Sequence, residues 1–106
     1  MNTQNNPAIE HCHTMADVRR NIDALDERIV PLIAERSAYV AQAARIKQNA
    51  DQIFDHARIE FIIERVRAQA RKAGAPEAIV EAAYRAMIAA SSDFERGEFA
   101  RLRQEA

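Results

Sequence analysis

The chain has 106 residues, enough for one small domain. Fifteen basic residues against sixteen acidic ones give a formal net charge of −1, which argues against a nucleic-acid-binding protein because such proteins usually carry a basic excess. No apolar run approaches the roughly 18–20 residues of a membrane span, and the first residues lack the basic start and apolar core of a signal peptide. A single cysteine cannot form an internal disulfide, so we expect a cytoplasmic protein. Together with the charge and the absence of a long apolar run, this predicts no membrane and no nucleic-acid partner.

The composition favours an all-α fold. The chain is rich in alanine, has two glycines, three prolines and no tryptophan, and contains few β-branched runs. A short chain of long helices buries little apolar surface by itself, so we expect self-association to complete its core.

Residues 1–13 are polar and show no periodicity, which predicts a disordered N-terminal tail before a helical domain over 14–106. The tail contains His11, Cys12 and His13 in succession. Adjacent residues rarely form one specific metal site and no second cluster completes this one, so we expect no metal.

A first helix is predicted to begin after Thr14, a suitable N-cap, and to end at Ile46. Asp17 is a shorter counterpart of the acid in a capping box. The helix carries a heptad-like apolar seam, a pattern that usually packs against a partner helix. Pro31 lies inside this seam, but the pattern continues in phase across it, so we predict one long kinked helix in preference to two. The seam comprises Met15, Val18, Ile22, Leu25, Ile29, Leu32, Tyr39, Ala43 and Ile46.

Two further helices are predicted after a loop over 48–54. Asp55 is a plausible N-cap of the second helix, and Gly74 is expected just beyond its C-terminal end. Pro76 suits the first turn of a third helix, which we expect to fray after Gly97.

Each predicted helix carries an ionisable residue where its apolar face should continue. Arg36 occupies the next position of the first seam, and Lys47 follows about 20° away around the helix and about 16 Å along it. Ser91 and Glu95 continue the apolar face of the third helix, and Arg58 stands in the first turn of the second. Three cations and one carboxyl group facing a common interior indicate a site for a small dianion.

Purely structural explanations of these residues are open at this point. Arg36 would form a buried salt bridge with Glu95. Lys47 would be a solvated residue near a helix end, and Arg58 would belong to a lattice of surface charges.

Arg19 precedes Arg36 by seventeen residues, about 25 Å along the helix and about 100° around it. Arg19 therefore cannot reach the same ligand from the same chain. In an antiparallel dimer, the partner's Arg19 would approach it.

The stretch VRRNIDALDERIVPLIAERSAYVAQAARIK resembles the first helix of the all-helical chorismate mutase family. That family's pattern is a leading arginine, an I-x-x-L/I-D segment, a second arginine, and a lysine eleven residues further on. Here these are Arg19, Ile22 with Leu25-Asp26, Arg36 and Lys47. The similarity covers about residues 17–102, and the first helix is its specific part.

The resemblance implies an intertwined homodimer of three-helix subunits with two equivalent sites. It implies an isomerase of the shikimate pathway and aromatic amino acid biosynthesis, acting on a small dicarboxylate without cofactor or metal. Arg19 of the other chain and Arg36 would hold the two carboxylates, and Lys47 would reach the ether oxygen. Further substrate-binding positions implied by the family are Asp55, Arg58 and Ser91.

Two positions depart from the family pattern. Many chorismate mutases have a glutamate after the arginine of the second helix, where this chain has Ile59, and Glu60 lies about 100° further around. An apolar residue there resembles the isochorismate-pyruvate lyase branch. Most relatives have a glutamine that donates to the ether oxygen where this chain has Glu95, which donates only when protonated.

The sequence therefore predicts a chorismate mutase with Arg36, Lys47 and Glu95 as its catalytic residues. The alternatives are an isochorismate-pyruvate lyase, or a mutase of an amino-substituted chorismate. A non-catalytic dimeric helical module that docks onto another shikimate-pathway enzyme is the third possibility.

Overall fold

The computed structural model describes residues 9–105 of the chain. Its elements are α1 (Met15–Ile46), the short 3₁₀ helix η1 (Ala50–Gln52), α2 (His56–Ala73) and α3 (Glu77–Glu105). The described residues form no strand, so the all-α prediction of three helices with a long first one is confirmed.

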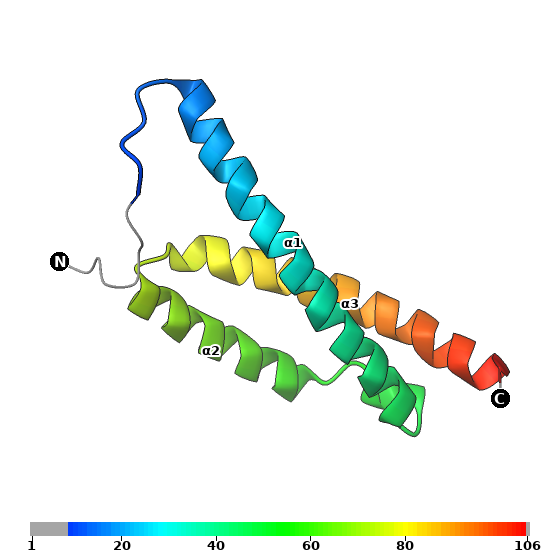
Figure 1. Cartoon of the computed structure of the whole chain (residues 1–106). Coiled ribbons are helices and arrows are strands. Elements are labelled where there is room, and N and C mark those ends of the chain that lie inside the picture. The colour runs from blue at the N-terminus through cyan, green and yellow to red at the C-terminus, as the bar shows by residue number, and fades with distance from the viewer. Residues whose placement is uncertain (1–8, 106) are drawn as a thin grey trace.

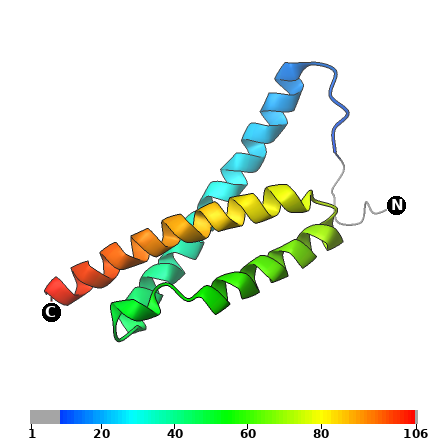
Figure 2. The same cartoon turned by 180° about the vertical axis from the view of Figure 1, so that it is seen from behind.

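The three helices make an elongated molecule of 56 × 27 × 19 Å. Helices α2 and α3 run antiparallel and side by side, and the C-terminal half of α1 packs against α3 (Figures 1 and 2). The N-terminal half of α1 projects away from both of the other helices (Figure 1). Most of the packing therefore involves only the second half of α1.

Helix α1 begins and continues as the sequence predicts. The side chain of Thr14 accepts a hydrogen bond from the Asp17 backbone N–H at 3.1 Å. The Asp17 carboxylate accepts from the backbone N–H of His13 at 3.2 Å, one residue before the usual capping-box donor. Pro31 lies inside the helix, which is kinked but does not end there.

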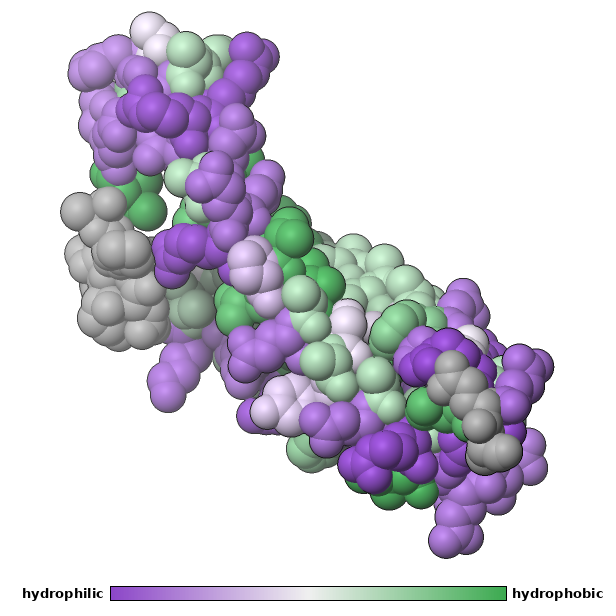
Figure 3. All heavy atoms as spheres, turned by 45° about the vertical axis from the view of Figure 1, so that its right-hand side comes forward, coloured by the Kyte–Doolittle hydropathy of each residue, from purple (hydrophilic) through white to green (hydrophobic). Residues whose placement is uncertain are grey.

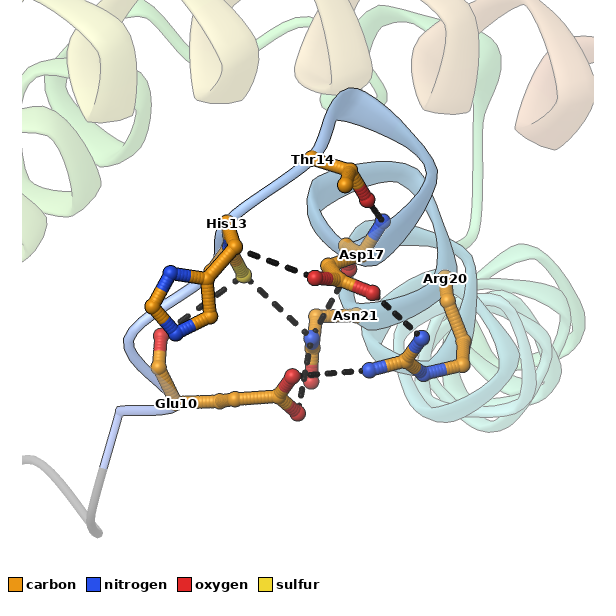
Figure 4. Close-up of polar contacts among 7 residues, drawn as sticks. Glu10, His13, Thr14, Asp17, Arg20 and Asn21 are labelled. Atoms are coloured by element: carbon orange, nitrogen blue, oxygen red, sulfur yellow. Dashed lines mark hydrogen bonds and ion pairs between the residues drawn. The ribbon is translucent and has the colours of Figure 1, made fainter.

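A polar cluster holds the chain just before α1 (Figure 4). The Glu10 carboxylate accepts hydrogen bonds from Arg20 at 2.8 Å and from Asn21 at 3.3 Å. Arg20 also pairs with Asp17 at 3.1 Å. Residues 1–13 were predicted to be a disordered tail, and residues 1–8 of that tail lie outside the described part of the chain. Residues 10 and 13 are bound to the first two turns of α1 by these contacts.

The predicted helix boundaries around α2 are confirmed. The Asp55 side chain accepts from the Arg58 backbone N–H at 3.0 Å and so caps α2. Gly74 ends the helix with φ at +76°, a left-handed conformation that glycine adopts without a steric cost. Pro76 directly precedes the first residue of α3, one position before the first turn in which it was predicted.

The prediction that the third helix frays after Gly97 is wrong, because α3 continues to Glu105. Arg103 in its last turns donates to the carbonyl oxygen of Ala44 at 2.9 Å and to that of Lys47 at 2.5 Å. A glycine inside a helix weakens it by only about 1 kcal/mol relative to alanine. The contacts of Arg103 with the end of α1 are enough to keep the segment after Gly97 helical.

The hydrophobic core of the chain is small. Its buried apolar residues are Ala44, Ile53, Ile63, Val66, Ala70 and Ile88. In contrast, the apolar seam on the projecting half of α1 is exposed, with Ile22 at 51%, Leu25 at 50% and Leu32 at 63%. Hydrophobic residues accordingly appear at the surface among hydrophilic ones (Figure 3). Within the described range, no helix is long and apolar enough to cross a membrane.

The capping contacts of Asp17 predict a pH-dependent stability. The His13 N–H and the Arg20 guanidinium lower the pKa of Asp17, so its contribution is present above about pH 4 and is lost as the pH falls through the depressed pKa. Asp17→Asn should lower the thermal unfolding midpoint by about 1–2 °C at pH 7, and by less at pH 2.5. Circular dichroism at low salt measures this difference.

The control for this prediction is Asp23→Asn, which changes an exposed carboxylate of the same helix. An equal loss for Asp17→Asn at both pH values would contradict the assigned role of its charge.

Candidate active site

The second half of α1, the start of α2 and the middle of α3 surround a cavity with a volume of about 460 Å³. Its lining includes seven of the eight residues that the sequence singled out, namely Arg36, Lys47, Asp55, Arg58, Ile59, Ser91 and Glu95. Three cations and two carboxylates thus meet in one small space, and one of these carboxylates also caps a helix.

Arg36 has no acidic partner within the described residues. One of its terminal nitrogens, Nη1, donates to the Ser91 hydroxyl at 3.2 Å, and this contact is partly buried. A salt bridge between Arg36 and Glu95, one of the structural alternatives, is not formed. The remaining N–H groups of Arg36 make no hydrogen bond in the described range, so the guanidinium can bind an incoming anion.

Lys47 instead pairs with Glu95 across the cavity. The distance from Lys47 Nζ to Glu95 Oε2 is 2.7 Å, and the two side chains are 27% and 9% exposed. The alternative that Lys47 is merely solvated therefore does not hold. The same Oε2 atom is buried and lacks a partner with hydrogen-bond geometry, so the contact is better described as charge attraction than as a directed bond. A buried oxygen of this kind can still engage a ligand.

The start of α2 brings a third cation to the cavity. The Arg58 guanidinium lies 5.4 Å from the centre of the Phe61 ring, a cation–π contact, and pairs with no carboxylate of the described residues. The expected alternative, a surface charge lattice that includes Arg58, is absent there. A lattice of that type forms further along α2, where Arg67 and Arg71 bind Glu77.

Ile59 lines the cavity, whereas Glu60 points away from it, as the sequence predicts. Both Glu60 oxygens accept from Arg85 on α3, at 3.2 and 3.3 Å. Arg85 also lowers the pKa of the Glu60 carboxyl group, which keeps it ionised in this surface pair. No carboxylate therefore occupies the position that follows the arginine of α2.

Arg19 does not line the cavity of its own chain. It lies exposed on the projecting half of α1, in agreement with the calculated separation from Arg36.

Sequence reasoning missed the contribution of Tyr39 and Gln52 to the cavity wall. Tyr39 belonged to the seam and was expected to pack against a helix. Gln52 lies in η1, within a segment that carries no periodic signal. Across the described residues, no group of three or more histidine, cysteine, aspartate or glutamate side chains is arranged to hold a metal ion.

Comparison with known proteins identifies the family to which the chain belongs. None of the curated proteins compared with the chain matches it. A family model described as chorismate mutase type II matches residues 18–96, about three quarters of the chain, a range that includes Arg19 and every cavity residue. The chain belongs to the chorismate mutase type II family.

Proposed function

We propose that this protein is a chorismate mutase that rearranges chorismate to prephenate. The observation that carries the proposal is the cavity in which Arg36, Lys47 and Arg58 converge while Arg36 lacks an acidic partner. The guanidinium of Arg36 is partly buried, and a cation partly withdrawn from water is favoured when an anion meets it. A dicarboxylate substrate supplies that anion, and membership of the family supports mutase-type activity.

To catalyse this rearrangement, the protein must position the substrate and stabilise the negative charge that develops on its ether oxygen. One carbon–oxygen bond breaks while one carbon–carbon bond forms, so the step needs neither a nucleophile nor a general base. Arg36 and the partner's Arg19 hold the two carboxylates and, with Arg58, favour the folded conformer of the substrate. Negative charge grows on the ether oxygen as its bond to carbon breaks, and the Lys47 ammonium donates to that oxygen.

The active form proposed here is an antiparallel, intertwined homodimer. The projecting half of α1 exposes its apolar seam, including Ile22, Leu25 and Leu32 at about half exposure or more. A second copy is the occupant that this seam fits, because heptad-like seams pack on partner helices. In this arrangement Arg19 of one chain enters the cavity of its partner.

A second candidate reaction follows from Ile59. An apolar side chain faces the cavity where many family members place a glutamate for the 4-hydroxyl group of chorismate. An isochorismate-pyruvate lyase, whose substrate carries this hydroxyl elsewhere, would use the same cations.

A mixing experiment tests both the reaction and the shared site. Arg19→Ala and Arg36→Ala homodimers should each lose at least about 100-fold in kcat/KM for chorismate, because each site lacks one carboxylate-binding arginine. After unfolding and refolding together in equal amounts, half of the dimers are mixed, and each mixed dimer has one intact site. The expected activity of the mixture is about a quarter of wild type.

Refolding each variant alone is the control for the mixing experiment. Restoration to about a quarter requires Arg19 to act in the partner's site. No restoration, with both variants dimeric, would contradict the shared site.

Substitution of Glu95 tests which group donates to the ether oxygen. The Glu95 carboxylate that pairs with Lys47 accepts hydrogen bonds but cannot donate one. Glu95→Gln supplies an amide donor at the same position, so its kcat should be severalfold above wild type. Glu98→Gln, one turn further along α3, is the matched control. An unchanged or lower kcat for Glu95→Gln would remove this role.

Ile59 is expected to influence the choice between the two candidate substrates. Ile59→Glu adds an acceptor for the 4-hydroxyl group and should raise kcat/KM for chorismate by about 3- to 10-fold. Steady-state assays of prephenate formation measure the change, and Ile59→Gln separates the hydrogen bond from the added charge. A loss of chorismate turnover in both variants would show that this position does not meet the hydroxyl.

A further inference from the structure

Side chains hold both polar groups of the peptide unit that links Lys47 to Gln48. The carbonyl oxygen of Lys47 accepts from Arg103 Nη2 at 2.5 Å. The backbone N–H of Gln48 donates to the side-chain oxygen of Gln52 at 2.8 Å. This peptide follows the end of α1, where the backbone of Lys47 leaves helical geometry with φ at −61° and ψ at 143°.

Arg103 acts as a C-cap supplied by another helix. The last carbonyls of a helix lack intrahelical donors and carry the negative end of its dipole, so a cation there is favourable. Arg103 satisfies the carbonyl of Ala44 at 2.9 Å as well as that of Lys47. Its guanidinium lies 3.5 Å from the centre of the Phe99 ring, which fixes the plane of the donor group.

Helix α3 therefore holds Lys47 at both ends. Arg103 binds the backbone carbonyl, and Glu95 binds the ammonium at 2.7 Å. The two α3 residues are eight positions apart, about 12 Å along the helix. The backbone and the ammonium of Lys47 are therefore each held by a fixed point on α3. These two points set the position of the ammonium in the cavity.

We propose that Arg103 is a positioning residue, which fixes the Lys47 ammonium by holding the Lys47 carbonyl. This inference rests on the proposed function, in which Lys47 stabilises charge on the ether oxygen. A shift of this ammonium by about 1 Å is expected to weaken the transition state more than the bound substrate.

The test compares Arg103→Ala and Arg103→Lys with Arg101→Ala in the full-length dimer. Arg101 forms an ion pair with Glu98 of its own helix, so it provides a matched loss of one arginine. We expect Arg103→Ala to lower kcat by about tenfold with KM changed by less than about threefold. Arg103→Lys should recover part of kcat, because a lysine can still donate to one carbonyl. Equal effects of Arg101→Ala and Arg103→Ala, or an unchanged kcat, would overturn the proposal.

Hydrogen exchange gives a readout that does not depend on turnover. Arg103→Ala should accelerate exchange of the Lys47 and Gln48 amides at least tenfold and leave the amides of α2 residues 62–66 unchanged. If Arg103→Ala fails to fold, Arg103→Lys carries the same comparison with a smaller expected change. Unchanged exchange at Lys47 and Gln48 would overturn the clamp itself. A wild-type protein that turns over no chorismate but shows the exchange effect would instead reject the proposed function.

Discussion

The ion pair between Lys47 and Glu95 is the interaction on which the architecture of the cavity depends. It joins the end of α1 to the middle of α3 in a setting where Glu95 is the one buried charged residue among those described. A buried pair of this kind contributes little net stability, since desolvation offsets most of the attraction. Its value lies in holding an ammonium group in the cavity that Arg36 also lines. Because the pair leaves the guanidinium of Arg36 without an acid, the cavity retains attraction for an anion.

The shape of the chain suits the proposed dimer, in which a second chain would complete the site. The buried core is limited to a few residues near the C-terminal half of α1 and the pair formed by α2 and α3. The other half of α1 carries an equally regular apolar pattern, and no other helix of the described residues packs on it (Figure 1). One dimer would therefore satisfy two needs, burial of this seam and delivery of Arg19. A non-catalytic docking module would need the first but would not need the unpaired Arg36.

The elements of the fold could be predicted from the sequence because their signals are local. Thr14, Asp55 and Gly74 mark helix ends through hydrogen bonds and backbone conformations formed within a few residues. The residues of the cavity could be predicted because helical periodicity places them on the inner faces. The ion-pair partner of each charged residue could not be predicted in this way. Periodicity allowed a pair between Arg36 and Glu95, whereas the register of α1 against α3 selects Lys47.

One contact between distant segments and one local loop conformation account for the remaining differences. The persistence of α3 beyond Gly97 depends on Arg103 reaching a carbonyl 56 residues earlier in the chain, which no local pattern encodes. Gln52 reached the cavity wall through the loop geometry around η1. Arg103 and Gln52 both bind the peptide that links Lys47 to Gln48, so these contacts surround the cation that the proposed mechanism places at the ether oxygen.

The most direct test of the central claim is product analysis with chorismate and isochorismate offered separately to the purified protein. Prephenate, salicylate and pyruvate would each be quantified at pH 5.5 and 7.5. The account predicts prephenate from chorismate as the faster reaction, with little salicylate from isochorismate. Salicylate and pyruvate as the faster products would contradict it in favour of the lyase, and absence of turnover with both substrates would contradict a catalytic role for this cavity in either reaction.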